Sequence, residues 1–244
     1  MSKHWQAFLI ALEFLTAIPV SISERDRPNK TGVSLLYYPV VGMIIAGVVL
    51  LVIYLLNSQT DWVVGVLSLT VWVALTGGLH LDGLADSADA WLGGLGDKTT
   101  TLHIMKDPTS GPIAVVVLLL VLLIKLVMLT ELIMNQQWVG IVLAIVLARM
   151  ALPLLLLTTP YVRPNGLGAE LVKTMPRKQI RIMIAIIGLL AVIVMGLIPL
   201  MLFLTALLIM RYYMLKRLDG TTGDTAGAMV ELLETTTLIL CVIY

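Results

Sequence analysis

Long apolar runs separated by short polar segments dominate the chain, and most of them are long enough to cross a membrane as helices. An α-helix rises about 1.5 Å per residue, so about 20 apolar residues cross the hydrocarbon core of a bilayer. The pattern predicts an all-α fold, a polytopic integral membrane helical bundle of about seven spans. The expected spans are residues 32–56, 62–80, 112–134, 139–159, 182–197, 200–216 and 225–244.

Two long segments need a further argument. Residues 182–210 run for 29 residues without a charge, which is too long for one ordinary span. Because Gly196 and Pro199 lie near the middle of this run, we predict a hairpin of two short spans there. Residues 160–181 are polar and are expected to form a long loop. The whole chain, residues 1–244, is expected to form a single transmembrane helical domain.

The N-terminal segment has a different pattern. Residues 4–18 are apolar but short, and Glu13 interrupts them. We therefore expect a surface-lying or re-entrant helix that ends at Pro19, in addition to the seven spans. A polar segment with three basic residues, 21–31, follows it.

Composition and charge support the membrane assignment. The chain is 59% hydrophobic and only 13% charged, whereas soluble domains carry about a quarter charged residues. The net charge of +1 provides no basic field for nucleic acid, so no nucleic-acid partner is expected. Thirteen of the sixteen Lys and Arg fall in alternate loops, 21–31, 92–111, 160–181 and 211–224. Short loops rich in Lys and Arg stay cytoplasmic, so these four are expected on the cytoplasmic side.

Three aspartates follow the second apolar run. Asp82, Asp86 and Asp89 are spaced four and three residues apart, which places them on one face of a helix. Unpaired carboxylates within about two turns repel one another, and a divalent cation is the simplest compensation. The alternative interpretation is a solvated helix end. His80 adjoins the cluster, but without a second histidine at ligand spacing a zinc site is not expected.

A second acidic segment begins more than a hundred residues later. Asp219 and Asp224 flank a turn that contains two glycines, and such a turn lets the backbone approach a phosphate closely. Glu231 lies seven residues after Asp224, so both belong to one face of the last expected span. An acidic residue inside a span is a functional candidate by default. The alternative is that Glu231 and Glu234 form ion pairs with Lys125 or Arg149, which lie in other spans.

The remaining candidate lies between these two segments. Lys106 could contact a phosphate as a point charge, or could be an ordinary lysine at the membrane surface. Hard carboxylate ligands without soft ones point to Mg²⁺ or Mn²⁺. The residues alone therefore predict Mg²⁺-dependent phosphoryl transfer at the cytoplasmic surface, with a nucleotide-diphosphate substrate.

The chain resembles the cobalamin synthase family, the adenosylcobinamide-GDP ribazoletransferases. The most specific match is the run GGLHLDGLAD, residues 77–86, and two departures from the family pattern occur at Ala17 and at 109–110. The other matching stretches, which appear in the expected order, are residues 14–20, 104–107 and 223–228 followed by Glu231.

The resemblance implies a late step of cobalamin biosynthesis in the bacterial cell inner membrane, with the active site on the cytoplasmic side. Adenosylcobinamide-GDP and α-ribazole, or its 5′-phosphate, would combine to give adenosylcobalamin, or its phosphate, and GMP. Mg²⁺ would be the cofactor. The expected catalytic residues are Asp82, Asp86, Asp89, Asp224 and Glu231, with the four aspartates as metal ligands and Glu231 or Asp89 as general base. The expected substrate-binding residues are His80, Lys106, Asp107, Asp219 and Gly223.

Other functions stay open at this level. A CDP-alcohol phosphotransferase or a UbiA-type prenyltransferase would also use aspartates on a Mg²⁺-diphosphate. An ion-coupled transporter would also place acids inside the membrane, and a purely structural membrane subunit would leave the aspartates unexplained. The oligomeric state, a homo-oligomer included, also stays open.

Overall fold

The computed structural model describes residues 3–20, 31–164 and 166–244. Within these ranges the chain is helical and no strand is present. The expectation for the basic segment 21–31 falls almost entirely outside the described residues. The helices are α1 (Lys3–Leu15), α2 (Thr31–Ser34), the 3-10 turn η2 (Leu35–Tyr37), α3 (Tyr38–Leu55), α4 (Asp61–Thr76), α5 (Leu79–Gly93), α6 (Lys98–Ile104), α7 (Pro112–Met134), α8 (Trp138–Thr158), α9 (Leu167–Thr174), α10 (Arg177–Met195), α11 (Leu197–Leu218) and α12 (Gly223–Ile243).

The polytopic helical membrane fold expected from the sequence is confirmed. Within the described ranges, six segments are long and apolar enough to cross a membrane, and a seventh is a pair of helices joined by a sharp bend. The expected hairpin at 182–210 is present as α10 and α11, which meet at Gly196. The stretch 160–181 is not only a loop, because it contains the short helix α9. At 13 residues, α1 is too short to span and packs on α2, η2 and α3.

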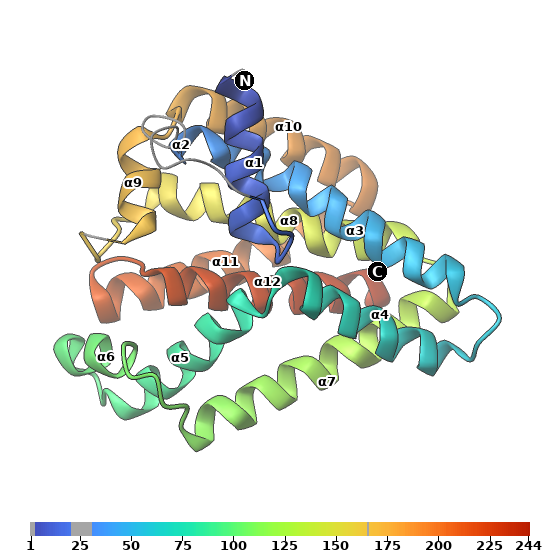
Figure 1. Cartoon of the computed structure of the whole chain (residues 1–244), viewed down its shortest axis with the longest axis horizontal. Helices are drawn as coiled ribbons and strands as arrows, with labels where there is room; N and C mark the ends of the chain where they lie inside the picture. The colour runs from blue at the N-terminus through green and yellow to red at the C-terminus, as the bar shows by residue number, and fades with distance from the viewer. Residues whose placement is uncertain (1–2, 21–30, 165) are drawn as a thin grey trace.

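α8 and α12 form the centre of the bundle. Of the most apolar 18 residues of α8, 72% are buried, against 11% for the corresponding stretch of α10. Figure 1 shows α12 crossing the middle of the molecule, with α1, α9 and α10 on one side and α5, α6 and α7 on the other. The large apolar side chains on the outer faces of α7, α10 and α11 are exposed, as lipid-facing side chains should be.

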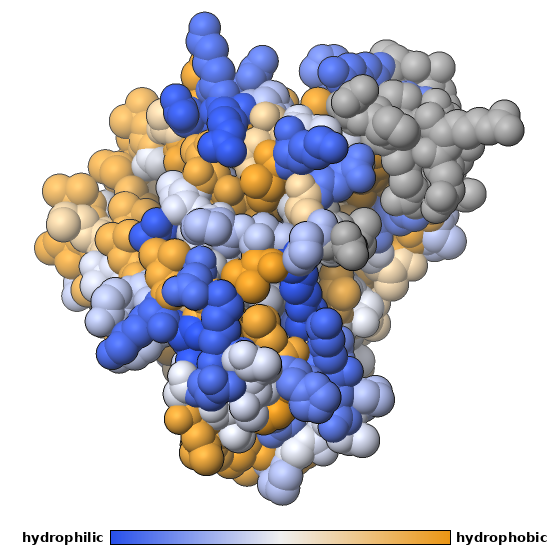
Figure 2. Space-filling model, turned by 90° about the vertical axis from the view of Figure 1, so that its left-hand side faces the viewer, coloured by the Kyte–Doolittle hydropathy of each residue, from blue (hydrophilic) through white to orange (hydrophobic). Residues whose placement is uncertain are grey.

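The described basic loops meet at one end of the bundle. Lys98 forms an ion pair with Asp219 at 2.7 Å, and the Arg217 guanidinium donates to the Trp91 carbonyl at 2.7 Å. Figure 2 shows polar side chains gathered on this end, which is at the left of Figure 1. The alternation of basic loops along the sequence therefore corresponds to a real clustering in space.

Candidate active site

The predicted second span is broken where two glycines occur together. α4 ends at Thr76, and Gly77 and Gly78 adopt positive φ values of 64° and 68°, a backbone region that favours glycine. α5 then leaves at 87° to α4. The expectation of one uninterrupted run from residue 62 to residue 80 was wrong for this reason. α5, which has 15 residues and carries three aspartates, lies beyond the bend.

α5 and α12 then cross at close range. A Cβ atom on Gly83 would lie 2.7 Å from the Asp224 carbonyl oxygen, and one on Gly227 would lie 3.3 Å from the His80 Cα. Only glycine at these two positions lets the backbones approach so closely. The crossing brings Asp82 of α5 and Asp224 of α12 to the same cavity, although 142 positions separate them in sequence.

The turn before α12 is held by backbone pairing with a distant segment. The Val162 amide donates to the Thr221 carbonyl at 2.9 Å, and the Thr221 amide donates to the Pro160 carbonyl at 2.8 Å. Thr222 then caps α12 through a reciprocal capping box with Thr225. This pairing fixes the stretch that carries Arg163 against the first turn of α12.

Arg163 is the functional candidate that the sequence did not single out. Its Nη2 lies 2.7 Å from the Asp224 Oδ2, and both side chains are mostly buried. Its only sequence signal is a basic residue next to Pro164 in a polar loop. A guanidinium presents a planar fork of donors that matches phosphate oxygens, so its presence beside the carboxylates fits a phosphate-bearing ligand.

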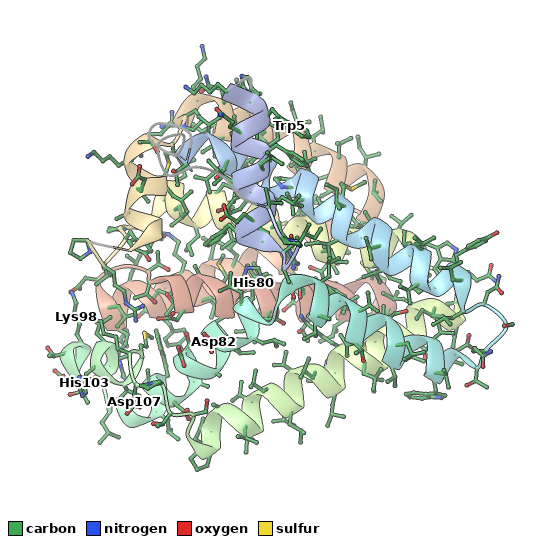
Figure 3. The ribbon with its side chains drawn as sticks, viewed as in Figure 1. Trp5, His80, Asp82, Lys98, His103 and Asp107 are labelled. Atoms are coloured by element: carbon green, nitrogen blue, oxygen red, sulfur yellow. The ribbon has the colours of Figure 1, made fainter. Side chains whose placement is uncertain are left out.

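A cavity of about 290 Å³ lies at this junction. Its polar residues include His80, Asp82, Arg163 and Asp224, and Gly223 lies on its wall. Apolar side chains from α1, α3 and α8 close the remaining sides. Figure 3 shows His80 and Asp82 near the middle of the molecule, whereas His103 and Asp107 lie at the far end of α5 and α6.

The carboxylates in and beside the cavity repel one another. Partial burial raises the pKa of Asp86 to about 6, with smaller contributions from the charges of Asp82 and Asp224. Arg163 is the cation that opposes this shift. A bound cation would reduce the repulsion between these carboxylates and would favour the ionised form of Asp86.

The donor set fits Mg²⁺ if the substrate supplies part of the coordination. Among the described residues, no group of three or more His, Cys, Asp or Glu side chains converges closely enough to hold a metal alone. Mg²⁺, however, commonly takes only one or two carboxylates and completes its shell with phosphate oxygens and water. Asp82 and Asp224, both on the cavity wall, can serve as that pair.

Asp89 has another partner. Its Oδ2 accepts from the Gly111 amide at 2.5 Å and its Oδ1 accepts from the Ala114 amide at 2.9 Å. The carboxylate therefore satisfies free amides at the start of α7, which is also where a negative charge is favourable. This geometry does not support Asp89 as a metal ligand or general base.

Glu231 is not among the residues that line the cavity, and it belongs to a buried network of charges. Lys125 of α7 forms ion pairs with Glu231 and Glu234 of α12, and Arg149 of α8 pairs with Glu234. All four side chains are at most 6% exposed. The two negative and two positive charges of this network compensate one another. Glu231 and Glu234 therefore form ion pairs with Lys125 and Arg149, which is the alternative given for them in the sequence analysis.

The remaining predicted residues lie on the surface. Lys106 is exposed. Asp107 accepts hydrogen bonds from the Thr109 amide and hydroxyl, which lowers its pKa. Asp219 caps α11 with positive φ, and its side chain is 80% exposed and paired with Lys98. The structure brings none of these three to the cavity.

The fold and the cavity define a polytopic helical membrane protein whose carboxylates and arginine suit a phosphate-bearing ligand. Comparison with known proteins agrees, since the family model described as cobalamin-5-phosphate synthase matches residues 7–242. The chain belongs to this family.

Similar proteins cover nearly the whole chain. The adenosylcobinamide-GDP ribazoletransferase of Stutzerimonas stutzeri is 50% identical over 233 residues, covering 95% of each chain. The protein of the same name from Pseudomonas aeruginosa is 47% identical over 242 residues, covering 98% of each. No solved structure matches the chain.

Proposed function

We propose that this protein is an adenosylcobinamide-GDP ribazoletransferase. It would join adenosylcobinamide-GDP to α-ribazole or its 5′-phosphate, forming adenosylcobalamin or its phosphate and releasing GMP. The observation that carries the proposal is identity of about one half to proteins of that name over nearly their whole length. The motif GGLHLDGLAD supports it, because its His80 and Asp82 line the cavity with Asp224.

The chemistry follows from the groups at the open side of the cavity. A ribose hydroxyl of the ribazole attacks the phosphorus nearer the corrinoid and loses its proton to solvent. A new P–O bond forms, and the P–O bond between this phosphorus and the oxygen that leaves with GMP breaks. Arg163 holds non-bridging oxygens of the diphosphate, and the charge that develops on GMP is stabilised there. Asp82 and Asp224 would hold Mg²⁺, and the ion would supply positive charge to the diphosphate.

The same assignment predicts where the reaction occurs. The described basic loops share the end of the bundle that carries the start of α12, and basic loops remain cytoplasmic. We therefore place the site at the cytoplasmic face of the inner membrane. A soluble nucleotide substrate and the GMP product can reach that face without crossing the bilayer.

Product analysis tests the proposal. Purified protein in detergent is incubated with adenosylcobinamide-GDP, α-ribazole and Mg²⁺, and released nucleotides are separated by chromatography. GMP formed in equal amount to the corrinoid product is the expected result. CMP from a CDP-alcohol, pyrophosphate from a prenyl donor, or substrate-driven ion flux in proteoliposomes without GMP would each replace the proposal with a rival function.

A further inference from the structure

Tyr161 lies on the cavity wall, against the first turns of α9 and α12. A Cβ atom on Gly168 would overlap the Tyr161 ring, and one on Gly166 would lie 2.7 Å from the Tyr161 hydroxyl oxygen. Gly223, the first residue of α12, approaches the same oxygen, since a Cβ atom there would lie 3.7 Å from it. All four residues line the cavity of about 290 Å³. The hydroxyl is therefore held at a defined place in the site.

The backbone that carries Tyr161 also carries Arg163 into the same cavity. Tyr161 pairs with Thr221 in an isolated parallel bridge, so the chain is extended there. In an extended chain residues two apart point to the same side. Tyr161 and Arg163 both line the cavity, whereas Val162 between them does not. A hydroxyl and a guanidinium are therefore presented side by side to whatever ligand the cavity binds.

The Tyr161 hydroxyl has a proton to donate. Burial raises the pKa of Tyr161, and the positive charge of Arg163 opposes the shift without reversing it, so the phenol keeps its proton at neutral pH. The backbone amides of Gly168 and Gly223 donate to its oxygen. A hydroxyl whose oxygen accepts from amides can still donate its own proton. Within the part of the chain that the structure describes, no acceptor takes that proton.

We propose that Tyr161 is a substrate-contact residue, whose hydroxyl donates a hydrogen bond to a non-bridging oxygen of the diphosphate that Arg163 holds. This assignment rests on the proposed function. A phosphate oxygen is negatively charged and accepts hydrogen bonds, so it suits a place where a hydroxyl and a guanidinium both donate. That oxygen is charged before the reaction as well as during it. Loss of the contact should therefore weaken binding of the diphosphate substrate itself.

Two other roles for Tyr161 predict different results. If only its ring matters, as packing against the start of α9, then removing the hydroxyl changes no binding. If the hydroxyl instead holds the Asp224 carboxylate, then removing it moves the Mg²⁺ midpoint of turnover and leaves diphosphate binding at saturating Mg²⁺ unchanged. Arg163 already holds that carboxylate, with 2.7 Å between its Nη2 and the Asp224 Oδ2, which favours a ligand as the acceptor for Tyr161.

Equilibrium binding tests the assignment on the full-length protein in detergent with saturating Mg²⁺. The probes are inorganic pyrophosphate, adenosylcobinamide-GDP and α-ribazole, which carries no phosphate, each measured with the wild type and Tyr161→Phe. We expect Tyr161→Phe to bind both diphosphates about tenfold more weakly and α-ribazole within about twofold of wild type. Tyr212→Phe, at a position of α11 that is 57% exposed, is the matched control and should change none of the three.

A fluorinated tyrosine at position 161 keeps both the ring and the oxygen, and so tests the proton itself. Its phenol ionises nearer neutral pH than that of tyrosine, and the phenolate cannot donate to phosphate. Relative to wild type, pyrophosphate binding by this protein should weaken as pH rises through that ionisation. Wild-type pyrophosphate binding by Tyr161→Phe, or no pH-dependent loss in the fluorinated protein, would overturn the assignment. An equal loss of α-ribazole binding in Tyr161→Phe would also overturn it.

The outcomes separate this inference from the proposed function. If the wild type releases GMP and Tyr161→Phe binds both diphosphates normally, the Tyr161 contact fails alone. If the wild type binds pyrophosphate through Tyr161 and releases no GMP, the transferase proposal fails while the diphosphate contact remains.

Discussion

Replacing Lys125 with methionine should destabilise the protein strongly. The side chain is 4% exposed and neutralises Glu231 and Glu234, which are 6% and 1% exposed. It also lies over the Trp72 ring, 5.1 Å from its centroid. Breaking a buried ion pair by removing one partner costs roughly 3–5 kcal/mol, because the other charge stays buried and uncompensated. Each kcal/mol shifts the Tm of a chain of this size by about 2–4 °C, so a fall of at least about 6 °C is expected.

Two further variants make the prediction specific. Lys125→Met combined with Glu231→Gln removes one charge of each sign, so the double variant should recover at least half of the lost stability. Lys98→Met is the matched control, because its pair with Asp219 is exposed and should leave Tm unchanged. The assay is thermal unfolding of purified protein in detergent, followed by GMP release below all the transitions.

Either of two results would refute this reasoning. An unchanged Tm in Lys125→Met would mean that the network of buried charges does not contribute to folding. A double variant that folds normally and releases no GMP would return Glu231 to the chemical role expected from the sequence.

Three more predictions follow from the site. Gly83→Ala should lower stability by about 1–3 kcal/mol and reduce turnover, because the new Cβ meets the Asp224 carbonyl, whereas Gly47→Ala, with open space around it, should do neither. Asp86→Asn should raise Tm at pH 7 in metal-free buffer but not at pH 4. The pKa of Asp86 in the folded state, about 6, lies above its value in the unfolded state, so ionisation of this carboxyl destabilises the folded protein as pH rises. An effect of Asp86→Asn on Tm that does not depend on pH would contradict this reasoning. Asp89→Asn should cost about 0.5–2 kcal/mol of stability while leaving the Mg²⁺ midpoint of turnover unchanged, and a shifted midpoint would make Asp89 a metal ligand.

The sequence predicted the spans well because the bilayer fixes their length and composition. The expected span 112–134 coincides with α7, and the expected span 139–159 differs from α8 by one residue at each end. The break after Thr76 was missed because apolar residues continue up to it. The Gly77–Gly78 pair was the available signal, since adjacent glycines commonly mark a turn.

The site was harder to predict because it depends on tertiary contacts. Helical spacing correctly placed Asp82 and Asp86 on α5. Spacing cannot show, however, that the Asp89 carboxylate accepts hydrogen bonds from backbone amides at the start of α7. Arg163 reaches Asp224 only through backbone pairing between segments about sixty residues apart in sequence, which no local pattern records. Glu231 illustrates the opposite case, in which an acid inside a span serves as an ion-pair partner.

The most direct test of the account is a Mg²⁺ titration of GMP release by the wild type, Asp82→Asn and Asp224→Asn. Asp219→Asn is the matched control, because this exposed aspartate lies five residues from Asp224 and is paired with Lys98. We predict that turnover requires Mg²⁺, that Asp82→Asn and Asp224→Asn lower it at least about a hundredfold or move its midpoint to higher Mg²⁺, and that Asp219→Asn behaves as wild type. Wild-type turnover by Asp82→Asn or Asp224→Asn at every Mg²⁺ concentration would contradict the account.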